Sequence, residues 1–309
     1  MEKGLVIKST GSWYTVKNGP NIIKCKIKGK FRIKGISTTN PVTVGDLVNY
    51  KIISKNNIGI ITNIRERKNY IIRRASNLSR EAHLIACNID QAFLMFTLNF
   101  PETPLEFVDR FLVTSEAYHI PTILIINKID LYDAPTLEKL ISIKEIYKNA
   151  GYQCYETSVT KRINVDIIKD LMKNKINVIS GNSGVGKSAL INAINKNLNL
   201  KVEEISSYHK KGKHTTTFSE MFELEDGGYI IDTPGIKGFG LIDFEDNEIS
   251  LFFPEIFKTS KDCQYYNCSH THEPKCAVKK ALEDGTVSMS RYRSYVNILN
   301  KDESKYRIE

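Results

Sequence analysis

The stretch Asn177-Val-Ile-Ser-Gly-Asn-Ser-Gly-Val-Gly-Lys-Ser188 decides the fold class of this 309-residue chain. It joins a short apolar segment to a run of the form G-x-x-x-x-G-K-S, and the segment SALINAINK after it predicts a helix. In this arrangement main-chain N–H groups and a helix N-terminus surround phosphates, the lysine reaches the β- and γ-phosphates, and the serine hydroxyl binds Mg²⁺. We therefore expect catalytic roles for Lys187 and Ser188, within a phosphate-binding loop made of Gly181, Asn182, Ser183, Gly184, Val185, Gly186, Lys187, Ser188 and Ala189.

A second phosphate-site motif, Asp232-Thr-Pro-Gly235, follows the apolar segment YIID. At the end of a strand, Asp232 would hold Mg²⁺ through water, and the Gly235 N–H would sense the γ-phosphate. Between the two motifs lies the polar segment KKGKHTTT (210–217), which suits a switch loop. One of its threonines would complete the Mg²⁺ shell, and Thr216 is favoured over its neighbours by a small margin.

The segment Asn127-Lys-Ile-Asp130 follows the apolar run TILII and has the form of a guanine-reading motif. Its aspartate would accept hydrogen bonds from the N1–H and N2–H₂ groups of guanine, which adenine does not offer. Thr157-Ser-Val159 would bring main-chain N–H groups to the guanine O6. A surface turn is the alternative interpretation in so lysine-rich a chain. The predicted base pocket comprises Asn127, Lys128, Ile129, Asp130, Ser158 and Val159.

Residues 73–242 alternate apolar runs typical of buried parallel strands, such as QAFLMFTLN, with segments of helical periodicity, such as LEFVDRFLVTSEAYH. This pattern predicts a doubly wound α/β domain whose ligands lie beyond the carboxyl ends of its strands. In an ordinary GTPase the base motifs follow the phosphate loop, whereas here they precede it. Circular permutation of a domain whose termini lie close together preserves the site, so we expect a circularly permuted P-loop GTPase domain.

Residues 1–72 predict a separate basic barrel. About five short strands rich in β-branched residues suit an OB-fold-like barrel. Residues 1–74 hold 16 Lys and Arg against three acidic residues, whereas the rest of the chain has a net charge of −4. This asymmetry predicts a polyanion partner, here RNA. Base stacking and filling of the barrel are the alternatives for Trp13, Tyr14, Phe31 and Tyr50, and filling is favoured for any single one. A basic face is predicted from the alternate positions of Lys24, Lys26, Lys28, Lys30, Arg32 and Lys34.

Residues 243–309 predict a small, mostly helical domain built on a zinc site. Cys263-x4-Cys268-x-His270-x5-Cys276 supplies three thiolates and one imidazole, the ligand set of a closed structural Zn²⁺ site. His272 is the rival ligand, and the C-x-H spacing favours His270. Two helices are expected after the cluster, on either side of Gly285.

The ordered set of NKID, GNSGVGKS, HTTT, DTPG, FPEI and the Cys/His cluster, after a basic barrel, resembles the RsgA (YjeQ) family of small-ribosomal-subunit biogenesis GTPases. The resemblance covers nearly the whole chain. It implies a GTPase that assists late assembly of the small (30S) subunit and is stimulated by it, with GTP or GDP, Mg²⁺ and one structural Zn²⁺ as ligands. It also supports His270 as the fourth zinc ligand. Val159 departs from the usual alanine, with little consequence expected for a main-chain contact.

The site lacks one group that Ras-type GTPases use. The position just after D-x-x-G holds Ile236, which cannot orient the attacking water, so intrinsic hydrolysis should be slow. His214 is a candidate for that task, with a ribosomal element or water alone as alternatives. An RNA-binding scaffold with incidental hydrolysis, and a GTPase serving the large subunit, are the competing functional hypotheses.

Composition limits where the chain works. No apolar run approaches the roughly 18 residues of a membrane span, and the N-terminus lacks the pattern of a signal peptide. Six cysteines in a chain of this length do not form a disulfide scaffold. We therefore expect a cytoplasmic protein that binds no membrane. The family resemblance implies the small subunit and its rRNA as partners, and we expect a monomer.

Overall fold

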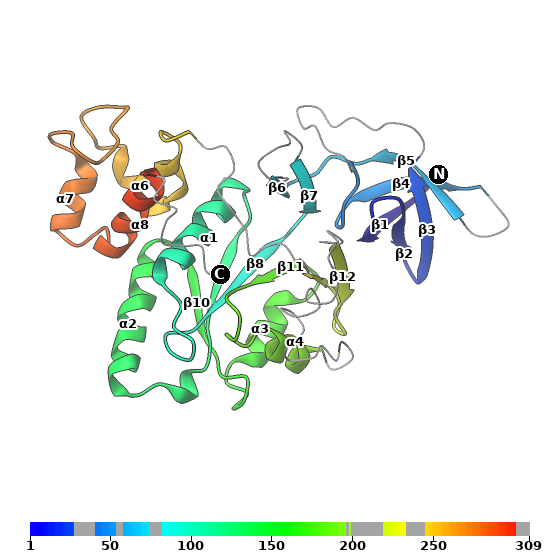
Figure 1. Cartoon of the computed structure of the whole chain (residues 1–309), viewed down its shortest axis with the longest axis horizontal. Helices are drawn as coiled ribbons and strands as arrows, with labels where there is room; N and C mark the ends of the chain where they lie inside the picture. Colours follow the sequence, from blue (N-terminus) through cyan, green and yellow to red (C-terminus); the bar gives the residue numbers. More distant parts are fainter. Residues whose placement is uncertain are drawn as a thin grey trace.

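The computed structural model describes residues 1–27, 41–53, 58–74, 82–195, 198, 219–232 and 245–300. Figure 1 shows a barrel and a helical module at opposite ends of the molecule, with an α/β sheet between them. Within the described residues, no helix combines the length and the apolar composition that a membrane crossing requires.

The N-terminal barrel has the strand order β1-β2-β3-β5-β4 and closes through pairing of β1 with β4. Its strands are β1 (Glu2–Ser9), β2 (Tyr14–Asn18), β3 (Asn21–Ile27), β4 (Leu47–Ile52) and β5 (Ile58–Ile64). All neighbours are antiparallel except β3 and β5, which are parallel. This order is that of an OB-fold, so the expected barrel is confirmed.

Side chains of the barrel alternate between its core and solvent. Along β3, Ile23 and Cys25 are buried while Lys24 and Lys26 are exposed, as expected of alternate positions in a strand. Tyr14 and Tyr50 are core residues with 2% and 0% exposure, so they fill the barrel and do not stack on bases. Trp13 is exposed, and the Lys26 ammonium lies 4.3 Å from the centroid of its ring. Phe31 and the basic positions from Lys28 to Lys34 lie outside the described residues.

The central sheet has the order β10-β9-β8-β11-β13-β12. Its strands are β8 (Gln91–Phe96), β9 (Thr122–Ile126), β10 (Gln153–Glu156), β11 (Ile176–Ser180), β12 (Ser219–Glu223) and β13 (Tyr229–Asp232). Only β12 runs antiparallel to its neighbour in this order. The parallel strands therefore end at one common edge, where all the described nucleotide motifs begin.

In the part of the chain that the structure describes, four helices cover the two faces of this sheet: α1 (Leu105–Ala117), α2 (Ala134–Asn149), α3 (Val165–Met172) and α4 (Lys187–Ile194). Leu94 and Phe96 of β8 pack in one core with α1 and α2. Phe93 and Met95 of the same strand pack in a second core with α3 and α4. Alternate residues of one strand thus enter opposite layers, which confirms the doubly wound arrangement.

The barrel continues the central sheet. Strand β1 pairs antiparallel with β12, with Lys8 opposite Glu220 and Ser9 opposite Ser219. Eleven strands of the described ranges therefore form one sheet. The Lys8 ammonium lies 2.8 Å from the Glu220 carboxylate. Leu5 and Ile7 of β1 pack against the core of the central domain, whereas Val6 faces the barrel core.

A two-stranded sheet of β6 (Tyr70–Arg74) and β7 (Ala82–Cys87) follows the barrel in the chain. Buried Asp46 connects this region to the barrel, because it accepts a 3.1 Å hydrogen bond from the Cys87 thiol of β7 and two 2.7 Å hydrogen bonds from the Arg67 guanidinium. The pattern of residues had not predicted this hairpin.

The C-terminal module contains a 3₁₀ turn η4 (Ile249–Phe252) and the helices α6 (Pro254–Ser260), α7 (Ala277–Glu283) and α8 (Met289–Leu299). The two helices expected on either side of Gly285 are α7 and α8. Val113 of α1 belongs to the core of this module. The buried Arg291 of α8 forms an ion pair of 2.9 Å with Asp109 of α1, so the module is anchored to the central domain.

Candidate functional site

The glycine-rich loop lies between β11 and α4, as its motif predicted. Gly181 has φ +147° and Gly186 has φ +104°, conformations that favour glycine. A Cβ at Gly181 would lie 2.0 Å from the Met95 carbonyl oxygen, and one at Gly186 would lie 2.5 Å from Asn127 Nδ2. Both positions therefore exclude a side chain on steric grounds as well.

The lysine and serine of this loop begin α4. The Lys187 ammonium donates to the carbonyl oxygens of Gly181 and Asn182, each at 2.6 Å, so it lies against the start of the loop. Ser188 is buried in the first turn of the helix. A helix N-terminus, whose first N–H groups have no acceptor within the helix, is a favourable place for phosphate oxygens.

Asn127 connects three loops at the carboxyl edge of the sheet. Its Nδ2 donates to the Val185 carbonyl oxygen at 2.8 Å, and its Oδ1 accepts from the Thr157 hydroxyl at 2.9 Å. Its main-chain N–H donates to the carbonyl oxygen of Phe96 at 2.9 Å. The structure thereby brings the predicted base motif, the Thr157-Ser-Val159 segment and the phosphate loop together.

Lys128 and Asp130 follow Asn127 in the base motif. Asp130 is exposed, as a base-reading carboxylate must be, and accepts a 3.1 Å hydrogen bond from the Thr160 hydroxyl. The hydroxyls of Ser158 and Thr160 hold the pKa of Asp130 below its usual value, so the group remains an ionised acceptor. Lys128 has a left-handed backbone (φ +65°), and its ammonium donates to the Phe100 carbonyl oxygen at 2.5 Å.

The predicted magnesium ligands are only partly described. Strand β13 ends at Asp232, next to β11, with Ile231 opposite Val178. This register places the backbone of Asp232 at the same sheet edge as the phosphate loop. The side chain of Asp232, together with His214, Thr216 and Gly235, lies outside what the structure describes.

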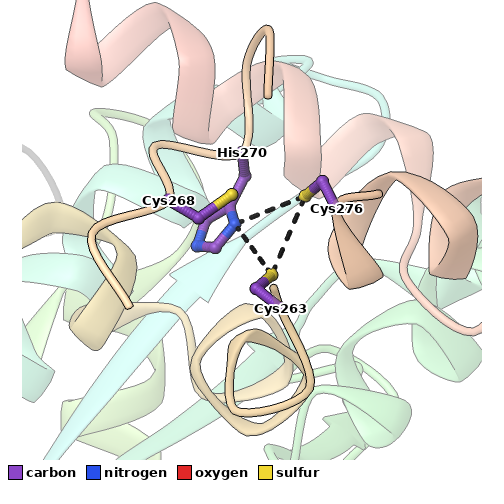
Figure 2. Close-up of side chains that lie close together, drawn as sticks. All are labelled: Cys263, Cys268, His270 and Cys276. Carbon is purple, nitrogen blue, oxygen red and sulfur yellow. Dashed lines mark hydrogen bonds between the residues drawn. The ribbon is translucent and has the colours of Figure 1, made fainter. Parts of the chain in front are cut away.

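The three cysteines and one histidine of the predicted metal site meet in space (Figure 2). One ligand atom from each of Cys263, Cys268, His270 and Cys276 lies within 4.8 Å of all the others. The Cys263 and Cys276 sulfurs are 3.9 Å apart, and His270 Nδ1 lies 3.7 Å and 3.5 Å from them. The rival His272 is exposed and interacts with the Thr271 hydroxyl at 3.0 Å, outside the cluster.

The chemistry of these donors fits a divalent soft metal. Burial and the neighbouring thiols raise the pKa of Cys268 to about 12, and burial lowers the pKa of His270. Without a cation, Cys268 and His270 therefore favour their neutral forms. A zinc ion would reverse the preference of the thiols, because its charge stabilises thiolates.

The loop that carries His270 is held from two directions. The Glu273 carboxylate accepts from the Ser269 and Thr271 N–H groups at 2.7 Å and 3.1 Å. The hydroxyls of Tyr292 and Tyr295 on α8 donate to the His270 and Ser269 carbonyl oxygens, both at 2.7 Å. The ligand positions are thus set by packing against α8 and by the hydrogen bonds of the Glu273 carboxylate within the loop.

Sequence motifs had not indicated two further groups near the sites. Tyr132, two residues after Asp130, bonds through its hydroxyl to the ends of both β8 and β9. The second group is the buried ion pair of Arg291 and Asp109, which lie 182 positions apart in the chain. For Tyr132, its position just after the base motif could have indicated a role in the site. For the buried ion pair, no sequence pattern indicated the contact.

A phosphate loop at the centre of a parallel sheet, with the base motif before it in the chain, defines a circularly permuted P-loop GTPase. Comparison with known proteins gives the family. A sequence profile of the RsgA GTPase matches residues 64–242, and one of the RsgA N-terminal domain matches residues 3–61. The chain belongs to the RsgA GTPase family.

Relatives and solved structures agree with this assignment. The small ribosomal subunit biogenesis GTPase RsgA 2 of Bacteroides thetaiotaomicron is 54% identical over 307 residues, 99% of each chain. The Flavobacterium psychrophilum protein named small ribosomal subunit biogenesis GTPase RsgA is 51% identical over 309 residues, 99% of this chain and 95% of its own length. The crystal structure of YjeQ from Thermotoga maritima superposes with a TM-score of 0.79 at 33% identity, covering 97% of this chain and 98% of that one. YloQ, a circularly permuted GTPase, gives a TM-score of 0.76 at 33% identity, with 98% and 96% covered.

Proposed function

We propose that this protein is a GTPase that binds the small ribosomal subunit, assists its late maturation and leaves after hydrolysis. The observation that carries the proposal is that one chain combines three parts: a circularly permuted P-loop GTPase domain, a basic OB-fold barrel and a Cys₃His module. Relatives at about half identity over the full length carry the name of a small-subunit biogenesis GTPase.

Guanine selection is assigned to the loop around Asp130. The ionised carboxylate would accept from the N1–H and N2–H₂ groups of the base, and Asn127 would face N7. The Lys128 stem would cover the ring, and the main-chain N–H groups of Ser158 and Val159 would approach O6. The exposure of Asp130 and the lowered pKa of its carboxyl support this assignment.

Phosphoryl transfer is assigned to the loop 181–189 and to the residues that follow β13. Lys187 would move from the loop carbonyls to the β- and γ-phosphates, where its charge offsets the charge of the transition state. Ser188, Thr216 and Asp232 would hold Mg²⁺, which when bound neutralises the phosphate oxygens. Gly235 would contact the γ-phosphate, and His214 is proposed to orient the attacking water, because Ile236 cannot.

The Cys₃His cluster is proposed to hold one structural Zn²⁺. All four positions of a tetrahedral site would be filled by the protein, so no position remains for catalysis. Its role would be to keep the C-terminal module folded against α1.

Exposed Lys24 and Lys26 support RNA as the partner of the barrel. Phosphate contacts from such a face would supply affinity without sequence selection. We place the protein in the cytoplasm, where ribosomes assemble, and propose that it acts as a monomer.

Binding that depends on the nucleotide separates this function from its alternatives. Co-sedimentation with purified small subunits should be strong with a non-hydrolysable GTP analogue and weak with GDP. Equal binding in both states would favour an RNA-binding scaffold whose hydrolysis is incidental. Preferential binding to large subunits would favour a GTPase of the other subunit.

A further inference from the structure

The loop 97–104, between β8 and α1, lies against the nucleotide edge although none of the recognised motifs includes it. The Phe100 carbonyl oxygen accepts from the Lys128 ammonium. A Cβ placed on Gly184 would lie 3.5 Å from Cδ of Pro101. The position of this loop therefore affects both the base motif and the phosphate loop.

One hydroxyl joins this loop to the base motif. Tyr132 Oη accepts from the Leu98 N–H at 2.8 Å and donates to the Asn127 carbonyl oxygen, also at 2.8 Å. The Tyr132 ring is 8% exposed and packs in the core that α1 and α2 share with the sheet. A group so buried has few alternative positions, so its hydroxyl fixes the separation between the ends of β8 and β9.

Tyr132 also closes the turn that carries the base-reading carboxylate. The 3₁₀ turn η1 spans Ile129–Leu131, and the Tyr132 N–H donates to the Ile129 carbonyl oxygen at 3.2 Å. Asp130 is the central residue of that turn. The Tyr132 backbone and hydroxyl thus hold the turn on one side and Asn127 on the other.

Asn127 transmits this position to the remaining loops, through its side-chain bonds to Val185 and Thr157. We infer that the Tyr132 hydroxyl is the positioning group of the guanine pocket, setting nucleotide affinity and the preference for guanine over hypoxanthine. This inference rests on the proposed guanine-nucleotide function. Tyr132 acts through Asn127 and the turn, because its hydroxyl contacts the Leu98 N–H and the Asn127 carbonyl oxygen.

The test replaces the hydroxyl alone. Tyr132→Phe keeps the ring but leaves the Leu98 N–H and the Asn127 carbonyl without the hydroxyl in a buried place. Tyr147→Phe is the matched control, because Tyr147 is also buried and its hydroxyl donates a 2.9 Å bond to Asp109, away from the nucleotide edge. Affinities for fluorescent GDP, unlabelled GDP and IDP, together with the thermal midpoint, are measured for the parent and both variants.

Loss of two buried hydrogen bonds predicts a GDP affinity about tenfold weaker in Tyr132→Phe. The GDP-to-IDP preference should fall by about threefold, because a displaced Asp130 gains less from the 2-amino group that IDP lacks. Tyr147→Phe should change both quantities by less than about twofold, even where its thermal midpoint falls as far.

Three results would overturn the inference. One is a Tyr132→Phe variant whose GDP affinity and GDP-to-IDP preference stay within twofold of the parent. Another is an equal change in Tyr147→Phe, which would indicate a general loss of stability. The third needs no variant: rapid hydrogen exchange at the Leu98 amide of the parent bound to GDP would show that the bond is not maintained. A parent that fails to bind GDP would instead contradict the proposed function itself.

Discussion

The buried guanidinium of Arg291 joins the C-terminal module to the central domain. It contacts Asp109 at 2.9 Å and Glu255 at 2.7 Å and 3.1 Å, with both Arg291 and Asp109 only 1% exposed at the side chain. Its carbon Cζ also lies 4.6 Å from the centroid of the Phe253 ring. Asp109 additionally accepts from the hydroxyls of Ser294 and Tyr147.

Replacing Arg291 by methionine keeps the length of the side chain but leaves two carboxylates buried without their cation. Breaking such a pair from one side costs about 3–5 kcal/mol of unfolding free energy. For a unit of this size that loss lowers the thermal midpoint by roughly 10 °C. Arg293→Met is the matched control, because Arg293 lies on the same helix and is exposed, and a change within about 0.5 kcal/mol is expected there.

The loss of unfolding free energy in Arg291→Met should also depend on pH. Burial raises the pKa of Asp109, and the Arg291 guanidinium opposes that rise. Without Arg291 the folded-state pKa lies further above the unfolded value. A carboxyl with a raised folded-state pKa stabilises the fold at low pH, and this contribution is lost as the pH rises through that pKa. The loss of unfolding free energy in Arg291→Met should therefore be smaller near about pH 5 than near about pH 8.

Urea unfolding followed by circular dichroism, with zinc release to a chromogenic chelator measured in parallel, provides the assay. Zinc should leave Arg291→Met faster, since α8 also holds the His270 loop through Tyr292 and Tyr295. Adding Asp109→Asn should recover about 1–2 kcal/mol relative to the sum of the single losses. If Arg291→Met and Arg293→Met unfold at the same urea concentration and release zinc at the same rate, the buried ion pair does not anchor the C-terminal module.

Three other changes test the remaining sites. Asp130→Asn exchanges an acceptor-only group for a mixed donor and acceptor, so GTP should bind at least about a hundredfold more weakly by competition titration; undiminished affinity would contradict the base pocket. Cys268→Ser should abolish stoichiometric zinc in elemental analysis and loosen the C-terminal module while GDP binding survives; a parent protein purified under reducing conditions without zinc would show that the cluster has another role. The double change Lys24→Gln and Lys26→Gln should weaken small-subunit binding and reduce its salt slope by up to about two, whereas Lys139→Gln on α2 should not; an unchanged slope would assign docking to another surface.

Local patterns predicted the parts of the fold that depend on local chemistry. The phosphate loop requires glycine at 181 and 186, because a side chain there would collide with Met95 and Asn127. The sequence motif itself specifies glycine at both positions. The order of motifs predicted a permuted sheet, since the carboxyl ends of parallel strands share one edge. The spacing of Cys263, Cys268, His270 and Cys276 predicted a cluster that the structure brings together.

Contacts between distant segments could not be predicted in this way. The pairing of β1 with β12 joins residues more than 200 positions apart, and nothing in either strand specifies the other. The Arg291–Asp109 pair has the same origin. The positions of Tyr14 and Tyr50 could not be decided from sequence either. Aromatic residues suit both stacking on bases at the surface and packing in the core of a barrel. Only the closed barrel shows that both side chains point inward.

We expect the small ribosomal subunit to activate a nucleotide site that hydrolyses GTP slowly by itself. The most direct measurement is steady-state phosphate release by the intact protein with purified small and large subunits in parallel, at saturating GTP and low salt. Small subunits should stimulate phosphate release by at least about a hundredfold, as supplying one missing stabilising group does, and large subunits should not stimulate it. Turnover that is unchanged by small subunits, or raised equally by both, would contradict this expectation.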